Sequence, residues 1–181
     1  NEAYQQAVAA KGSKYYQLKL LAEQGDKNAQ YELGRDRLKG EHYELAYKWL
    51  TKASNSGVPE ASYLLGTMHY AGRGPATRDK DKAMMYFRQA ANKGIALAQY
   101  NVGHMYYRGY GATKDPVKAY QWMTIAVLQD PEVTSIETGG EYSTGSRIGE
   151  ARNQVKGELS GSQIKQAEEA AEKWLNENRS H

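Results

Sequence analysis

The sequence contains no cysteine, and this absence excludes disulfides, cysteine-containing zinc sites and thiol nucleophiles from all 181 residues. It also lacks any run of about 18 consecutive apolar residues, which a membrane-spanning helix requires. Acidic and basic side chains nearly balance, with 21 against 24 and a net charge of +3. A nucleic-acid-binding surface needs a concentrated excess of lysine and arginine, so we expect no nucleic-acid partner. The absence of a long apolar run means that we also expect no membrane span.

Phenylalanine is also scarce, with one occurrence against 15 tyrosines. Tyrosine suits positions that are half buried and half exposed to water, so this ratio indicates many such positions. The chain begins with Asn1 rather than methionine, and a removed secretory signal or a trimmed end would each explain this. Because the absence of cysteine also suits an oxidising compartment, we expect a periplasmic or secreted protein, with a cytoplasmic one as the alternative.

The sequence does contain an internal repeat. A leucine or valine followed by glycine recurs at intervals of 32 and 37 residues, as Leu33-Gly34, Leu65-Gly66 and Val102-Gly103. A second pattern recurs in step, in which an alanine is followed by an aromatic residue after three positions and by another alanine after seven. It begins at Ala46, Ala83 and Ala119. Separations of three, four and seven residues place side chains on one helical face, so each unit is predicted to be two antiparallel helices, A and then B.

The glycines of each unit are predicted to have two different roles, one at helix crossings and one at helix ends. Those of the Leu/Val-Gly pairs lie inside helix A, where glycine costs about 1 kcal/mol relative to alanine. This cost indicates that another helix crosses closely at Gly34, Gly66 and Gly103. Glycines that follow the B helices are expected to cap them, and these are Gly57, Gly94 and, for a partial unit at residues 14–25, Gly25.

Aspartates predict where helix B begins. Asp115 directly precedes Pro116, an arrangement typical of an N-cap followed by proline in the first helical turn. Asp79 holds the matching position in unit two. Unit one has a shorter loop between its helices and lacks this signal.

In this order the residues resemble the Sel1-like repeat family, a relative of the tetratricopeptide repeats. The pattern is A-x-x-x-L-G-x-x-Y-x-x-G-x-G, then D-x-x-K-A, a tryptophan or tyrosine, and A-A-x-x-G. Unit three matches it at Ala98, Val102-Gly103, Tyr106, Gly109, Gly111, Asp115, Lys118-Ala119, Trp122 and Ala126. Unit two has His69 where the family usually has tyrosine, and unit one is degenerate, with Arg37 at that place.

The resemblance covers about residues 14–130, with units at about 29–57, 61–94 and 98–130. It implies an all-α fold, a right-handed superhelical solenoid of α/α helix pairs. Residues 148–181 include "ELSGSQIKQAEEAAEKWLNE", which resembles the helix that closes many such arrays. A terminal cap is needed because the last repeat would otherwise expose an apolar face. Its apolar stripe is Ile164, Ala167, Ala171, Trp174 and Leu175.

Residues 131–147 separate the array from this cap and are rich in glycine, serine and threonine, as expected of a loop. In the family this join is usually shorter. Glu141 and Tyr142 within the loop are therefore candidates for a second binding site.

No residue pattern points to catalysis. The histidines His42, His69, His104 and His181 have no acidic residue at ligand spacing on the same helical face, so we expect surface or groove histidines and no metal site. Asp79 and Asp81 are better explained by helix capping and solvated charge than by a cation site. Gly72-Arg73-Gly74 lacks the lysine and serine or threonine of a phosphate-binding loop. We predict a protein that is not an enzyme and has no cofactor.

One stripe on the A helices varies between units and is the candidate recognition surface. It consists of Glu32, Arg35 and Lys39 in unit one, Leu64, Thr67 and Ala71 in unit two, and Asn101, His104 and Arg108 in unit three. The resemblance implies that A helices line the concave side. Tyr70 and Tyr107, just before the loops between helices A and B, either supply aromatic anchors for a partner or pack between repeats. The candidate partner-binding residues are Arg35, Leu64, Thr67, Tyr70, Asn101, His104, Tyr107 and Arg108.

These features predict a non-enzymatic module that binds another protein. The resemblance suggests its most concrete form, a periplasmic immunity-type protein that binds and neutralises a toxin or effector. A scaffold or adaptor in envelope or signalling assemblies is the first alternative. The second is a module that binds peptidoglycan or glycan fragments, with tyrosines as stacking platforms.

Overall fold

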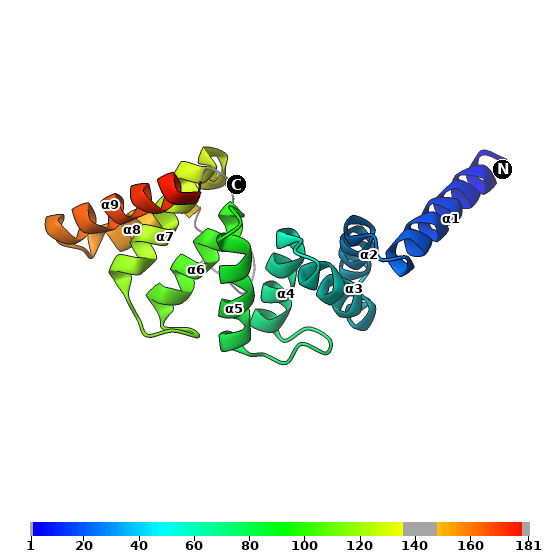
Figure 1. The fold of residues 1–181 in the computed structure, drawn as a ribbon, viewed down its shortest axis with the longest axis horizontal. Helices are drawn as coiled ribbons and strands as arrows, with labels where there is room; N and C mark the ends of the chain where they lie inside the picture. The colour runs from blue at the N-terminus through cyan, green and yellow to red at the C-terminus, as the bar shows by residue number, and fades with distance from the viewer. Residues whose placement is uncertain (1, 136–147, 179–181) are drawn as a thin grey trace.

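The computed structural model of the chain describes residues 2–135 and 148–178, and the predicted all-α fold is confirmed for them. The elements are α1 (Glu2–Glu23), α2 (Lys27–Lys39), α3 (Tyr43–Asn55), α4 (Pro59–Ala71), α5 (Lys80–Ala91), α6 (Ala96–Arg108), α7 (Pro116–Gln129), the short 3₁₀ helix η1 (Pro131–Ser135), α8 (Ile148–Gly157) and α9 (Gly161–Asn178). They follow one another along an elongated array, from α1 at one end to α8 and α9 at the other (Figure 1).

Consecutive helices pack as pairs. Helix A of each unit packs along its own helix B, as α2 with α3, α4 with α5 and α6 with α7. Each helix B then packs on the next helix A, so that the pairs stack into the α/α solenoid that the sequence predicts. The reason is that one helix pair cannot bury its apolar face alone.

The glycines inside the A helices lie where a B helix crosses, as predicted. A Cβ atom on Gly34 would be 2.8 Å from Cγ of Leu50, and one on Gly103 would be 2.8 Å from the Ala119 carbonyl oxygen. Real Cβ atoms do not approach neighbours so closely, so glycine permits the short distance between the paired helices at these positions.

Helix ends also follow the sequence signals. The carboxylates of Asp79 and Asp115 accept hydrogen bonds from the backbone N–H groups of Lys82 and Lys118, each at 2.9 Å. Both aspartates are therefore N-caps, which confirms the capping role. Helix α3 of unit one begins after His42, whose side chain makes no capping hydrogen bond. The three glycines predicted to cap the B helices and α1 have positive φ, 98° at Gly25, 85° at Gly57 and 86° at Gly94.

A side-chain hydrogen bond between residues eight positions apart joins each of α1, α3 and α5 to the helix A that follows it. The side-chain nitrogen of Gln30 donates to the carbonyl oxygen of Ala22 at 3.1 Å, and that of Gln99 donates to Ala91 at the same distance. At the corresponding place before α4, the hydroxyls of Ser54 and Ser62, also eight residues apart, are hydrogen-bonded at 2.8 Å. The C-terminal half of α1 thus contacts α2 as a helix B contacts the following helix A, although α1 itself extends back to Glu2.

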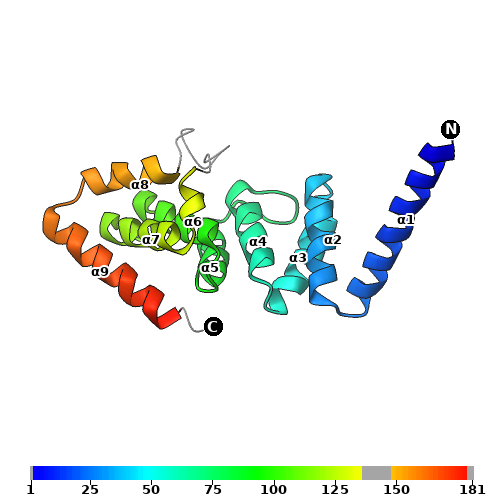
Figure 2. The ribbon, with the colours of Figure 1, turned by 90° about the horizontal axis from the view of Figure 1, so that it is seen from above.

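The C-terminal helices lie on opposite sides of α7 (Figure 2). Leu175 and Ala171 of α9 are buried against Ile125 of α7, and the indole rings of Trp174 and Trp122 meet edge to face at 5.5 Å. The predicted capping helix is therefore present. Helix α8 covers the other side of α7 and contributes Ile148 and Val155 to the last core cluster. Of the helices in the described part of the chain, none has the length and apolar character that spanning a membrane requires.

Candidate functional site

The variable stripe of the A helices is accessible over its whole length. We call it the A-helix face and define it by the nine residues Glu32, Arg35, Lys39, Leu64, Thr67, Ala71, Asn101, His104 and Arg108. Two of these side chains, at the C-terminal ends of α2 and α6, are exposed, and the other seven are half buried. Helices α2 and α4 are in direct contact, so their parts of this face adjoin.

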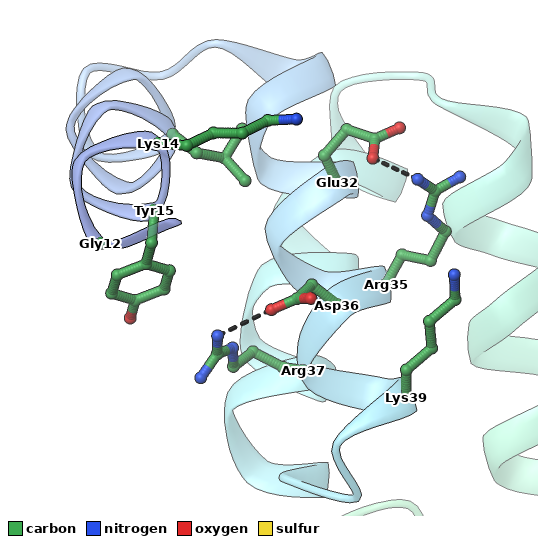
Figure 3. A pocket seen from close by; sticks show the side chains of 9 residues that line it. Gly12, Lys14, Tyr15, Glu32, Arg35, Asp36, Arg37 and Lys39 are labelled. Carbon is green, nitrogen blue, oxygen red and sulfur yellow. Dashed lines mark hydrogen bonds and ion pairs between the residues drawn. The ribbon is translucent and has the colours of Figure 1, made fainter. Parts of the chain in front are cut away.

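At its N-terminal end the A-helix face opens into a pocket of ≈ 640 Å³ between α1 and α2 (Figure 3). The pocket is lined by Gly12, Lys14, Tyr15, Leu18, Glu32, Arg35, Asp36, Arg37 and Lys39. Four of these side chains are cationic and two are carboxylates. The pocket is therefore a basic end of the face, although the whole chain is nearly neutral.

Two ion pairs occupy the α2 wall of this pocket. Arg35 binds the carboxylate of Glu32 one helical turn earlier, and Arg37 binds Asp36 with 2.7 Å between Nη2 and Oδ2. Each guanidinium also lies near a tyrosine ring, with 4.8 Å between Cζ of Arg37 and the ring centre of Tyr15. Such contacts hold the arginines along the pocket wall.

The middle of the face, on α4, carries no charge. The hydroxyl of Thr67 donates to the carbonyl oxygen of Leu64 at 2.7 Å, and the leucine side chain packs against the core of units one and two. Ala71 is half buried at the end of the helix. A partner that crosses this part meets a small and mainly apolar surface.

The other end of the face, on α6, is basic again. Burial, together with the positive charges of Arg108 and Lys80, lowers the pKa of His104 to about 4, so the imidazole is neutral at physiological pH. Nearby, burial raises the pKa of Tyr63, and the side chain of Asn101 has a smaller effect in the opposite direction. Arg108 is exposed and extends over the ring of Tyr110, so it is the cation best placed to meet a partner here.

The two predicted tyrosine anchors are used in packing. Tyr70 is only 4 % exposed, and Nζ of Lys80 lies 3.1 Å from its ring centre. Its burial removes it from the accessible face, because the loop that follows α4 places Lys80 over the ring. Tyr107 is half buried, and its hydroxyl donates to Glu158, the residue directly after α8. The second candidate site, Glu141 and Tyr142, lies outside the described residues.

His69 is a correction to the expectation of surface or groove histidines. Its side chain is 2 % exposed, because Nε2 lies 3.2 Å from the hydroxyl of Tyr47 while Nδ1 faces the carbonyl oxygen of Thr77. A carbonyl oxygen only accepts, so Nδ1 carries the proton and Nε2 accepts from the tyrosine. The ring also stacks on Tyr86, with 5.5 Å between the ring centres. His69 therefore joins units one and two and holds the loop after α4.

Among the described residues, no group of three or more histidine, aspartate and glutamate side chains is arranged to hold a metal ion. The acidic residues near the A-helix face are instead paired with arginines, as in the α1–α2 pocket. This face therefore offers charge, small apolar surface and shape, which are means of recognition.

Comparison with known families agrees with this architecture. A family model described as the Sel1 repeat matches residues 27–58, 59–95 and 96–131. The chain belongs to the Sel1 repeat family. Each unit expected from the sequence lies inside one of the three matched segments, and each Sel1 segment corresponds to one A and B pair of the structure.

Two solved structures share the fold of this Sel1 chain. One is a protective antigen of uropathogenic Escherichia coli strains with an SLR fold, which is 28% identical with a TM-score of 0.78 over 91% of this chain and 33% of its own. The chain thus spans about a third of that relative. The other is a Sel1 repeat protein from Oxalobacter formigenes, 32% identical with a TM-score of 0.60 over 78% of this chain and 96% of its own. No curated protein sequence matches the chain.

Sel1 repeat proteins are protein-interaction modules, and their scaffolds are generally non-catalytic. One recurring feature of the candidate surface was not predicted from the sequence. A tyrosine lies three residues before the glycine of helix A in each unit, at Tyr31, Tyr63 and Tyr100. The rings of Tyr31 and Tyr100 lie beside Arg35 and His104 of the A-helix face, at 5.5 Å and 6.3 Å. The constant position of these tyrosines in the repeat is the signal that would have identified them.

Proposed function

We propose that this chain binds a partner protein along the A-helix face, through a segment that crosses α2, α4 and α6. The observation that carries the proposal is the composition of this face. Its accessible positions differ between units, basic at both ends and uncharged in the middle, while the positions that recur are buried in packing. A surface that varies on a constant scaffold suits selection of one particular partner.

A protein partner is favoured over a glycan by the state of the tyrosines. Sugar rings stack on exposed aromatic faces, but Tyr70 is buried beneath Lys80. Tyr107 is half buried, and Nζ of Lys114 lies 5.5 Å from its ring centre. The A-helix face instead offers arginines and small apolar residues, which are common at protein interfaces.

The most specific form of the proposal is an immunity-type role, in which the chain binds and neutralises an effector protein. Its support is the family resemblance alone. Co-production of the chain with the product of an adjacent reading frame in a sensitive cell tests this form directly. Restored growth is expected, and loss of protection on replacement of Arg108 by glutamate would connect protection to the A-helix face.

The general proposal is tested by site-specific photocrosslinking in the source cell. A benzophenone amino acid replaces Thr67 or Ala71 on α4 in one set of proteins, and exposed Met85 or Arg88 on α5 in the control set. A discrete crosslinked partner is expected from the α4 positions and none from the α5 positions. Equal products from both sets, or products from the α5 set alone, would contradict binding at the A-helix face.

A further inference from the structure

The pocket between α1 and α2 combines open space with an unequal distribution of charge. Gly12 is a helical residue at its α1 wall, and a Cβ atom on this glycine would meet nothing within 4 Å. The volume of ≈ 640 Å³ lies in the range that holds small ligands or a few side chains. Among the described residues, no side chain closes this space next to Gly12.

The two lysines of the pocket have no ion-pair partner among the described residues, whereas both arginines have one. Lys14 extends from α1 toward α2, and Lys39 extends along α2 toward Arg35 (Figure 3). Both carboxylates of the lining are already used by Arg35 and Arg37. Two ammonium groups thus remain to bind an anion. In addition, Nε of Arg37 is buried and has no hydrogen-bond partner among the described residues.

The existing ion pairs do not prevent a partner carboxylate from entering. The side chains of Arg35 and Glu32 are each 43% exposed, and an ion pair in contact with water contributes little to stability. Exchange of Glu32 for an incoming carboxylate on Arg35 therefore costs little. Tyr15 and Leu18 add an apolar wall that suits the aliphatic part of a peptide.

We propose that the α1–α2 pocket binds a glutamate or aspartate side chain of the partner's segment, and so fixes the end of the A-helix face at which an acidic part of that segment lies. This inference rests on the proposed function, because Glu32, Arg35 and Lys39 belong both to the pocket and to the A-helix face. The occupant is an acidic peptide segment, with Lys14 and Lys39 as its principal cations.

The test uses the full chain and a short synthetic peptide of glutamate and leucine, with a matched peptide that has glutamine in place of every glutamate. Amide chemical shifts of the isotope-labelled protein are followed during titration. We expect saturable shifts around Gly12, Lys14 and Lys39 with the acidic peptide only, which weaken as salt is added. Shifts with both peptides, with neither, or only outside the pocket would overturn the proposal.

Two pairs of variants separate the pocket from general charge. Lys14→Gln with Lys39→Gln should weaken binding of the acidic peptide about fivefold or more, the effect of two exposed ion pairs. Lys27→Gln with Lys93→Gln removes the same charge elsewhere and should change binding less than about twofold. Gly12→Glu places a competing carboxylate in the pocket and should weaken binding, whereas Gly12→Gln should not. Equal effects within either pair would contradict the assignment.

A final competition identifies the anion. Tripolyphosphate should displace the acidic peptide less well than an unlabelled acidic peptide does at equal charge. Stronger displacement by tripolyphosphate would make the pocket a general anion site and overturn the peptide assignment. Failure of this inference is distinguishable from failure of the proposed function. If the pocket binds no acidic peptide but α4 still crosslinks to a partner, only this inference fails. If the pocket binds acidic peptide but α4 gives no crosslink, only the proposed function fails.

Discussion

Gly66 on α4 lies so close to the ring of Phe87 on α5 that a Cβ atom on the glycine would be 2.6 Å from Cδ1 of the ring. Phe87 is completely buried, so the ring is surrounded by other core side chains. Gly66→Ala should therefore destabilise the protein by about 1–3 kcal/mol through overpacking, although alanine itself favours a helix by about 1 kcal/mol. Urea denaturation measures the change in the free energy of unfolding.

Gly12 provides the matched control because it lies inside α1, where an added Cβ would meet no neighbour. Gly12→Ala should leave stability unchanged or raise it by up to about 1 kcal/mol, from helix propensity alone. If Gly66→Ala proved as stable as the parent, the close contact of α4 with α5 would be wrong.

The second prediction concerns the C-terminal cap. Leu175 is buried against α7, so Leu175→Ala should cost about 2–5 kcal/mol. Trp174 is only half buried, and Trp174→Ala should cost less than the roughly 3–5 kcal/mol of a fully buried tryptophan. Thermal unfolding checks this order, with exposed Glu172→Ala as the control that should change stability by less than about 0.5 kcal/mol. Equal melting temperatures for all three variants would mean that α9 does not stabilise the array.

The third prediction is a loss of stability at mildly acidic pH. The pKa of His104 in the folded protein is lowered to about 4 by burial and by Arg108 and Lys80, whereas an unfolded histidine has a pKa of about 6.5. Below pH 6.5 the unfolded chain therefore binds a proton that the folded protein does not. Stability that is fully present above this pH falls as the pH approaches 4, by about 2 kcal/mol between pH 7 and 5.

Chemical denaturation at a series of pH values measures this slope. His104→Gln should flatten it, because glutamine does not titrate. His69 should add to the slope with the same sign, since burial also lowers its pKa. A slope that His104→Gln does not alter would show that this imidazole is accessible to protons in the folded protein.

The fold could be predicted because its signals are local and recur. Asp79 and Asp115 cap helices through hydrogen bonds to residues only three positions later in the sequence. Gly66 indicates a helix crossing because only a residue without a side chain fits there. Burial of a polar residue carries no such signal. His69 is covered by Tyr47, which belongs to the preceding unit. Tyr70 is covered by Lys80, which is the first residue of the next helix.

The basic pocket was also beyond prediction from the sequence. Lys14 and Lys39 are 25 residues apart and face one space only because α1 packs on α2 at a particular angle. Lys39 lies in the mixed-charge segment 35–41, whereas Lys14 lies far from it in the sequence, so composition did not connect the two lysines. Arg35 was predicted from its place in the repeat, but its ion pair with Glu32 depends on side-chain conformation. The stripe was thus predictable, and the distribution of its charges required the structure.

The last prediction separates two neighbours at the α6 end of the A-helix face. Arg108 is exposed and available to a partner carboxylate, whereas the hydroxyl of Tyr107 is bound to Glu158. Arg108→Glu should weaken binding of the crosslinked partner at least about tenfold, or 1.4 kcal/mol, by replacing attraction with repulsion. Tyr107→Phe should change that affinity less than about twofold and instead lower stability by about 0.5–1.5 kcal/mol, because only the hydrogen bond to α8 is lost. Calorimetric titration of the two purified proteins measures both affinities, with exposed Arg88→Glu on α5 as the charge-matched control. If Tyr107→Phe alone abolished binding while Arg108→Glu did not, the partner would contact the tyrosine hydroxyl, and α8 would have to move to release it.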